Sequence, residues 1–165
     1  MNFALIFAGG TGTRMHTRTK PKQFLELNGK PIIIHTIEHF EVHQKIDGIV
    51  VVCVAEWINY LSDLLKRFHI KKVVNIIPGG KTGQESIFLG LQYIEKNISH
   101  NTEKDLVLVH DGVRPLIDEE LISLNIECAE INGNAITISP VVETIIKVDS
   151  NEEIVETIDR ENCRN

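Results

Sequence analysis

The fold of this chain is decided near its N-terminus, where residues 3–14 read FALIFAGGTGTR. Residues 3–8 are apolar without interruption, a pattern typical of a strand that is buried on both faces of a parallel sheet. The glycines that follow allow the backbone to approach a ligand closely and to aim N–H groups at its oxygen atoms. This stretch therefore predicts a strand that ends in an anion-binding loop.

Further along the chain, strands and helices alternate. Short runs rich in β-branched residues, which we expect to form parallel strands, lie at 3–8, 48–54, 72–77 and 105–110. Segments with helical periodicity lie at 31–43, 56–69, 84–97 and 118–131. Because crossovers between parallel strands are right-handed and cover both faces of a sheet, this order predicts a three-layer α/β/α sandwich with a mostly parallel sheet. Ligands of such sheets bind at the carboxyl ends of the strands, which is where the glycine motifs lie.

The pattern changes after Gly133. Residues 135–160 are predicted to form a β-hairpin arm with a polar turn at 150–153. No helical segment follows the hairpin, so we expect one domain over residues 1–165 that is incomplete at its C-terminus.

The composition argues against several classes of protein. A chain of 165 residues with 42% hydrophobic residues can bury the core of one soluble domain. The net charge is -6 with acidic and basic residues interspersed, so we expect no nucleic-acid partner, and no apolar run approaches the ~20 residues that cross a membrane. Cys53, Cys128 and Cys163 lie far apart, which argues against a disulfide framework or a zinc site and favours the reducing cytoplasm.

The glycine loop is a phosphate loop of an uncommon kind. It lacks the Gly-Lys-Ser/Thr ending of a Walker loop and the third glycine of a dinucleotide fingerprint. We expect the backbone here to bind a nucleotide through Ala8, Gly9, Gly10, Gly12 and Thr13. The alternative is a glycine-rich turn that has no ligand.

Two cations accompany this loop. Arg14 ends it, and Lys22 follows eight residues later, after Pro21 and shortly before the apolar Phe24. If both side chains converge on one phosphate group, they stabilise charge that develops there, and we expect Arg14 and Lys22 to be the catalytic residues. The alternative for Arg14 is an ordinary surface arginine.

A second group of polar residues follows the strand at 105–110, where residues 110–115 read HDGVRP. Asp111 is placed to bind a ribose hydroxyl, a substrate hydroxyl or Mg²⁺, and Arg114 is placed to bind a second phosphate. The alternative is an Asp–Arg ion pair that only caps the loop.

These motifs together resemble a known family. The loop ending in Thr-Arg-Met at 13–15, followed by Pro-Lys at 21–22, is similar to the front signature of the nucleotidyltransferases that activate sugars and polyols. The HDGVRP segment after a Pro-Lys-Gln start is similar to the cytidylyltransferases that act on methylerythritol phosphate or ribitol phosphate. The resemblance covers essentially the whole chain and implies a Rossmann-like nucleotidyltransferase fold, with CTP and a polyol phosphate as substrates.

The resemblance also implies a cytidine-binding loop at 78–86, PGGKTGQES. Gly79, Gly80 and Ser86 match the family pattern, but Gly83 stands where the family carries an arginine, a role that Lys81 or Gln84 could take over. From the residues alone, Ser86 is a serine at a helix start that bonds to its own backbone.

In the family, the hairpin arm crosses a two-fold axis and positions the polyol phosphate in the neighbouring subunit. By this resemblance, Thr144 and Arg160 bind the acceptor phosphate and the protein is a homodimer. Mg²⁺ is the expected cofactor, held mostly by the triphosphate with help from Asp111.

The implied reaction is transfer of a cytidylyl group from CTP to a polyol phosphate, with release of pyrophosphate. Ribitol 5-phosphate, which feeds teichoic-acid or capsule polymers, is favoured because Val113 precedes Arg114, as in the ribitol version of the motif. The methylerythritol phosphate enzyme of isoprenoid synthesis is one alternative. A non-catalytic nucleotide-binding module, favoured by Gly83 and by the missing C-terminal part, is another.

Overall fold

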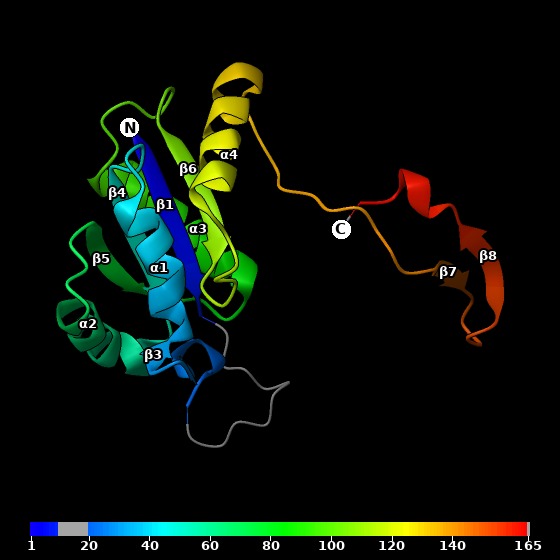
Figure 1. Cartoon of the computed structure of the whole chain (residues 1–165), viewed down its shortest axis with the longest axis horizontal. Helices are drawn as coiled ribbons and strands as arrows, with labels where there is room; N and C mark the ends of the chain where they lie inside the picture. Colours follow the sequence, from blue (N-terminus) through cyan, green and yellow to red (C-terminus); the bar gives the residue numbers. More distant parts are fainter. Residues whose placement is uncertain (10–19, 165) are drawn as a thin grey trace.

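The computed structural model describes residues 1–9 and 20–164. Its centre is a parallel sheet in the order β5-β4-β1-β6, formed by Val73–Pro78, Gly48–Cys53, Asn2–Ala8 and Leu106–Asp111 (Figure 1). All six residues of β4 are buried, as the continuous apolar run predicts for a strand covered on both faces. The four predicted parallel strands are confirmed to within one or two residues at their ends.

The predicted helices also form, and they cover both faces of the sheet. They are α1 (Ile32–Val42), α2 (Ile58–Arg67), α3 (Gly83–Asn97) and α4 (Glu119–Asn132). Side chains of α1, α2 and α4 pack in one core with Ala4 and Ile6 of β1, whereas α3 packs in a second core with Phe3 and Leu5. The three-layer α/β/α sandwich is therefore confirmed.

Gly90 permits the close packing of α3. A methyl group at this position would overlap the side chain of Leu5, so the absence of a side chain lets the helix lie directly on β1.

Short elements that the periodicity did not predict lie between β1 and α1. A 3-10 helix at Lys22–Phe24 is followed by a small antiparallel hairpin of β2 (Glu26–Leu27) and β3 (Lys30–Pro31). Its turn residues, Asn28 and Gly29, have φ angles of 52° and 76°. An Asn-Gly pair is the usual sequence of such a turn, so the signal was present in the sequence.

A 3-10 helix, Ala55–Trp57, leads from β4 into α2, so the segment predicted as one helix at 56–69 begins with a short 3-10 turn.

The predicted hairpin arm is present, with β7 (Ile145–Val148) paired to β8 (Ile154–Ile158) and a 3-10 helix at Arg160–Asn162. Figure 1 shows it in orange and red, extending away from the sheet at the end of a long connection from α4. Residues 135–139, the first part of the predicted arm, form no strand. The residue that follows them, Pro140, forms an isolated antiparallel β-bridge with Arg164. Across the described residues, none of the helices is both long and apolar enough to cross a membrane.

Candidate functional site

The glycine segments that follow β1 and β5 meet at the carboxyl edge of the sheet. A methyl group built on Gly9 would lie 2.9 Å from the Ser86 Oγ, and one built on Gly79 would lie 3.0 Å from the same atom. A side chain at either position would therefore collide with Ser86, and glycine at both positions lets the two segments pack together against it. Three of the predicted nucleotide-binding residues are thus brought together, and Gly80 follows directly.

Ser86 holds this junction through the backbone. The side chain is buried, and its hydroxyl donates to the Thr82 carbonyl at 2.9 Å while accepting the Gly80 N–H at 3.1 Å. The bond to Thr82 is the backbone interaction that the residues alone predicted for a serine near a helix start. Contact of Ser86 with a nucleotide stays a prediction.

The N-terminus of α3 lies in the same loop. Thr82 caps it by accepting the Glu85 N–H at 3.0 Å, and the Glu85 carboxylate accepts the Lys81 N–H at 2.7 Å. A Cβ on Gly83 would meet nothing within 4 Å, and the side chains of Lys81 and Gln84 are exposed. Gly83, where the resemblance implies an arginine, thus has space for a Cβ.

The segment that carries Lys22 is attached to the end of β1. The buried Gln23 donates from its Nε2 to the carbonyl of Ala8 at 2.7 Å. This hydrogen bond places the Lys22 backbone close to the point where Gly9 begins the glycine loop. The predicted residues Gly10, Gly12, Thr13 and Arg14 lie outside the described residues, so the convergence of Arg14 and Lys22 stays a prediction.

Asp111 and Arg114 lie at the end of β6, where Asp111 pairs in register with Phe7 of β1. Asp111 accepts the Val113 N–H at 3.1 Å and faces the Arg114 Nε at 3.5 Å. The Asp–Arg ion pair anticipated as the alternative is therefore present. Because the Arg114 side chain is 79% exposed, the pair contributes little to stability, and the guanidinium remains accessible to an anion.

Two side chains hold this loop through contacts that we did not predict. The Thr36 hydroxyl of α1 donates to the Gly112 carbonyl at 3.1 Å, and the His110 Nε2 lies 2.9 Å from the Arg114 carbonyl. Burial lowers the pKa of His110, which favours the neutral ring, and Nε2 must carry its proton because a carbonyl only accepts. A polar Thr36 on the apolar face of a helix was the available sequence signal.

Thr144 and Arg160 are not brought to this edge within the chain. Both are exposed on the arm, and Arg160 donates to the Val142 carbonyl at 3.0 Å. Figure 1 shows the arm well away from the ends of β1 and β6. Their predicted contact with an acceptor phosphate is untested.

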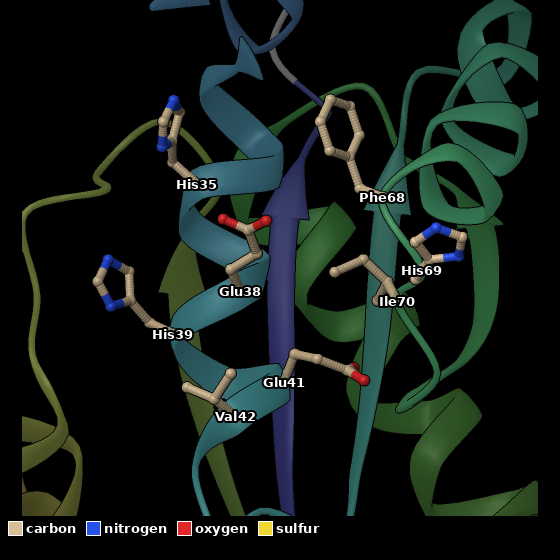
Figure 2. A pocket seen from close by; sticks show the side chains of 8 residues that line it. All are labelled: His35, Glu38, His39, Glu41, Val42, Phe68, His69 and Ile70. Carbon is tan, nitrogen blue, oxygen red and sulfur yellow. The ribbon is translucent and has the colours of Figure 1, made fainter. Parts of the chain in front are cut away.

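A groove of about 500 Å³ lies elsewhere, between α1 and the segment that follows α2 (Figure 2). In it, Glu38 pairs with Lys30 at 2.6 Å, and Glu41 accepts the N–H groups of Lys71 and Lys72 at 2.9 and 2.8 Å. None of the predicted site residues lines it, and the described part of the chain holds no group of three His, Cys, Asp or Glu side chains suited to a metal ion. The groove is therefore not assigned to the site.

The described residues form an α/β domain in which the glycine segments, the turn that carries Lys22 and the Asp111–Arg114 loop lie at the carboxyl edge of a parallel sheet, the edge where such sheets bind ligands. The chain belongs to the 2-C-methyl-D-erythritol 4-phosphate cytidylyltransferase family, whose model matches residues 2–165. The family resemblance found in the sequence is thereby confirmed.

Relatives and a solved structure agree with this assignment. A ribitol-5-phosphate cytidylyltransferase of Vibrio parahaemolyticus serotype O3:K6 is 59% identical over 158 residues, which are 96% of this chain and 65% of the relative. One of Streptococcus agalactiae serotype Ia is 49% identical over 160 residues, 97% of this chain and 66% of the relative. The 4-diphosphocytidyl-2C-methyl-D-erythritol synthase of Anaerococcus prevotii has a TM-score of 0.79 at 26% identity, covering 100% of this chain and 66% of that one. The chain thus spans just under two thirds of the length of these proteins.

Proposed function

We propose that the protein transfers a cytidylyl group from CTP to ribitol 5-phosphate, forming CDP-ribitol and pyrophosphate. The observation that carries this proposal is the meeting of Gly9, Gly79 and the Asp111–Arg114 loop at one sheet edge, beside the turn that carries Lys22. Ribitol 5-phosphate is preferred as acceptor because the relatives at 59% and 49% identity bear that name. The family name supports 2-C-methyl-D-erythritol 4-phosphate as the alternative.

The reaction requires little covalent chemistry from the protein. A phosphate oxygen of the acceptor attacks the α-phosphorus of CTP in line, and pyrophosphate leaves. The acceptor phosphate is already ionised at neutral pH, so no general base is needed. Catalysis then consists of positioning the two substrates and stabilising the charge on the α-phosphoryl oxygens and on the leaving pyrophosphate.

Each predicted residue has a part in this scheme. Lys22 and Arg14 neutralise the phosphoryl oxygens, and the backbone around Gly9 and Gly79 holds the nucleotide. Arg114 binds a phosphate of the acceptor, which its exposure permits. Asp111 offers one partly exposed carboxylate, which suits Mg²⁺ as a single protein ligand when the triphosphate supplies other oxygens. When bound, that ion would offset charge on the triphosphate.

The acting unit is a homodimer in the cytoplasm, where CTP is made. Apolar side chains on the arm support the dimer, since Ile146, Val148, Ile154 and Val155 are exposed in the single chain. Exposed apolar residues gathered on one element favour contact with another protein surface. Thr144 and Arg160 would then complete the acceptor site of the partner subunit.

The test is pyrophosphate release from CTP and Mg²⁺ with three acceptor conditions: ribitol 5-phosphate, 2-C-methyl-D-erythritol 4-phosphate, and none. We expect release and a CDP-polyol product with ribitol 5-phosphate, and loss of both when EDTA removes the metal. Faster turnover with 2-C-methyl-D-erythritol 4-phosphate would show that the protein is instead an enzyme of isoprenoid synthesis. CTP binding without any product would indicate a non-catalytic nucleotide-binding module.

A further inference from the structure

The residue after Lys22 is a buried amide with a fixed partner. Gln23 is only 2% exposed, although it lies in a short 3-10 helix close to the surface site. Its Nε2 donates to the Ala8 carbonyl across 15 residues of sequence. Burying an amide is unfavourable unless hydrogen bonds compensate for lost water, so an apolar side chain would fill this space at lower cost.

The same turn also packs in an aromatic cluster. Phe24 is fully buried and stacks on Trp57, with ring centroids 4.9 Å apart and planes at 21°. Tyr60 packs edge-on against both rings, at 5.4 Å from each. Lys20 lies 5.4 Å from the centre of the Tyr60 ring, so the segment before Lys22 contacts this cluster as well.

The turn that carries Lys22 is therefore held by two sets of contacts, the Gln23 hydrogen bond and the aromatic cluster. Backbone bonds close the turn around it, from the Phe24 N–H to the Pro21 carbonyl at 3.0 Å and from the Leu25 N–H to the Lys22 carbonyl at 3.1 Å. The aromatic cluster fixes the turn against α2, whereas Gln23 alone among these contacts ties it to the last residue of β1. The hydrogen bond from Gln23 to Ala8 therefore fixes the position of the Lys22 backbone relative to Gly9.

We infer that Gln23 is a positioning residue, which holds Lys22 in register with the backbone at the end of β1 where the nucleotide phosphates bind. This inference rests on the proposed function, since it assigns Gln23 to the same site. Misplacement of a catalytic group by about 1 Å lowers turnover by about 10²-fold. Loss of the hydrogen bond from Gln23 to Ala8 should therefore lower kcat strongly while the free energy of unfolding changes little.

The experiment is a double-mutant cycle between Gln23→Met, which keeps the side-chain length but removes the donor, and Lys22→Ala. If Gln23 acts through Lys22, Gln23→Met lowers kcat about 10²-fold in the unaltered protein and has almost no further effect when Lys22 is already alanine. A role in folding alone would give similar, additive losses in both backgrounds and would overturn the inference. Turnover within about twofold of the unaltered protein would overturn it too. Gln44→Met, the same change at an exposed glutamine, is the control.

A second variant and a second measurement keep the inference testable if Gln23→Met does not fold or if no acceptor is turned over. Gln23→Leu is close to glutamine in size, and its side chain has no group that can donate to Ala8. Trp57 is the chain's one tryptophan and stacks on Phe24, so its emission should report CTP binding at this turn. We expect both Gln23 variants to weaken CTP binding about tenfold, and to do so only while Lys22 is present. Unchanged CTP affinity in Gln23→Leu would overturn the inference even if the proposed transfer reaction were absent.

Discussion

The charge at position 22 should contribute more to the transition state than to CTP binding. Lys22 is a compact cation at the edge where the α-phosphoryl group would react. We expect Lys22→Ala to lower kcat by about 10²-fold or more, by analogy with removal of one preorganised donor, with a smaller change in KM for CTP. Steady-state kinetics of pyrophosphate release measure both quantities.

The matched control is Lys104→Ala, which removes an equal charge from an exposed loop before β6. Near-normal turnover in Lys22→Ala would contradict the role assigned to this lysine.

Removing a buried polar group next to the site should lower the free energy of unfolding, even where that group takes no part in the reaction. Thr36 is fully buried, and its hydroxyl supports the Gly112 carbonyl in the Asp111–Arg114 loop. Thr36→Val keeps the shape but leaves that carbonyl without this donor, so we expect the free energy of unfolding to fall by about 1–3 kcal/mol. Urea denaturation measures the difference. Thr36→Ser retains the hydroxyl and should recover part of the loss; equal stability of the Val variant would refute the assignment.

Two glycines allow the effect of backbone strain to be measured apart from the effect of steric overlap. A Cβ on Gly29 or on Gly83 would meet nothing within 4 Å, but only Gly29 has a positive φ, of 76°, in the β2–β3 turn. We expect Gly29→Ala to destabilise the fold by about 1 kcal/mol. Gly83→Ala, at the first position of α3, should stabilise it by about 0.5 kcal/mol, because the unfolded chain loses more freedom. Thermal unfolding of both variants tests the pair, and a shift of the same sign in both would contradict this explanation.

The start of β1 is coupled to the loop before β6 by an ion pair that should make stability pH-dependent. The terminal amine of Met1 lies 2.7 Å from Asp105, and this contact, with the Ser99 hydroxyl, lowers the pKa of Asp105 to about 2. An unfolded aspartate has a pKa of about 3.9, so the stabilisation is complete above that value and is lost as the pH falls toward 2.

Asp105→Asn should therefore be less stable than the unaltered protein at pH 7, and the two melting temperatures should converge as the pH falls from about 4 to about 2. Asp63→Asn is the control, because Asp63 belongs to an exposed pair with Lys66 on α2. A constant difference over this range would show that the pair does not act as described.

These elements show which parts of the structure a sequence can reveal. The long strands and helices were predicted because apolar runs and helical periodicity extend over many residues, as in β4 and α1. The β2–β3 hairpin has only two residues per strand and carries no periodicity, although Asn28-Gly29 marks its turn. The polar Thr36 on an apolar helix face is visible in the sequence, but the partners of Gln23 and Thr36 could not be predicted. These partners lie 15 and 76 residues away and become neighbours only in the folded chain.

The arm has no covering surface within the described part of the single chain. Among residues 1–9 and 20–164, its strands pair only with each other, and every residue of β8 is exposed. A domain-swapped or arm-exchanged dimer places such an element on an identical partner, because both subunits present the same surface. The acceptor site would then combine Lys22 of one subunit with Arg160 of the other.

This arrangement predicts complementation between two inactive variants. Lys22→Ala and Arg160→Ala should each have little activity alone, since each homodimer lacks one component in both sites. If the two are unfolded together and refolded as a 1:1 mixture, half of the dimers are mixed, and each mixed dimer has one intact site, so activity should rise to about a quarter of that of the unaltered protein. Refolding each variant separately before mixing is the control for exchange of subunits. If the arm serves its own subunit, the intact pair never forms in a mixed dimer, and the mixture stays as inactive as its parts.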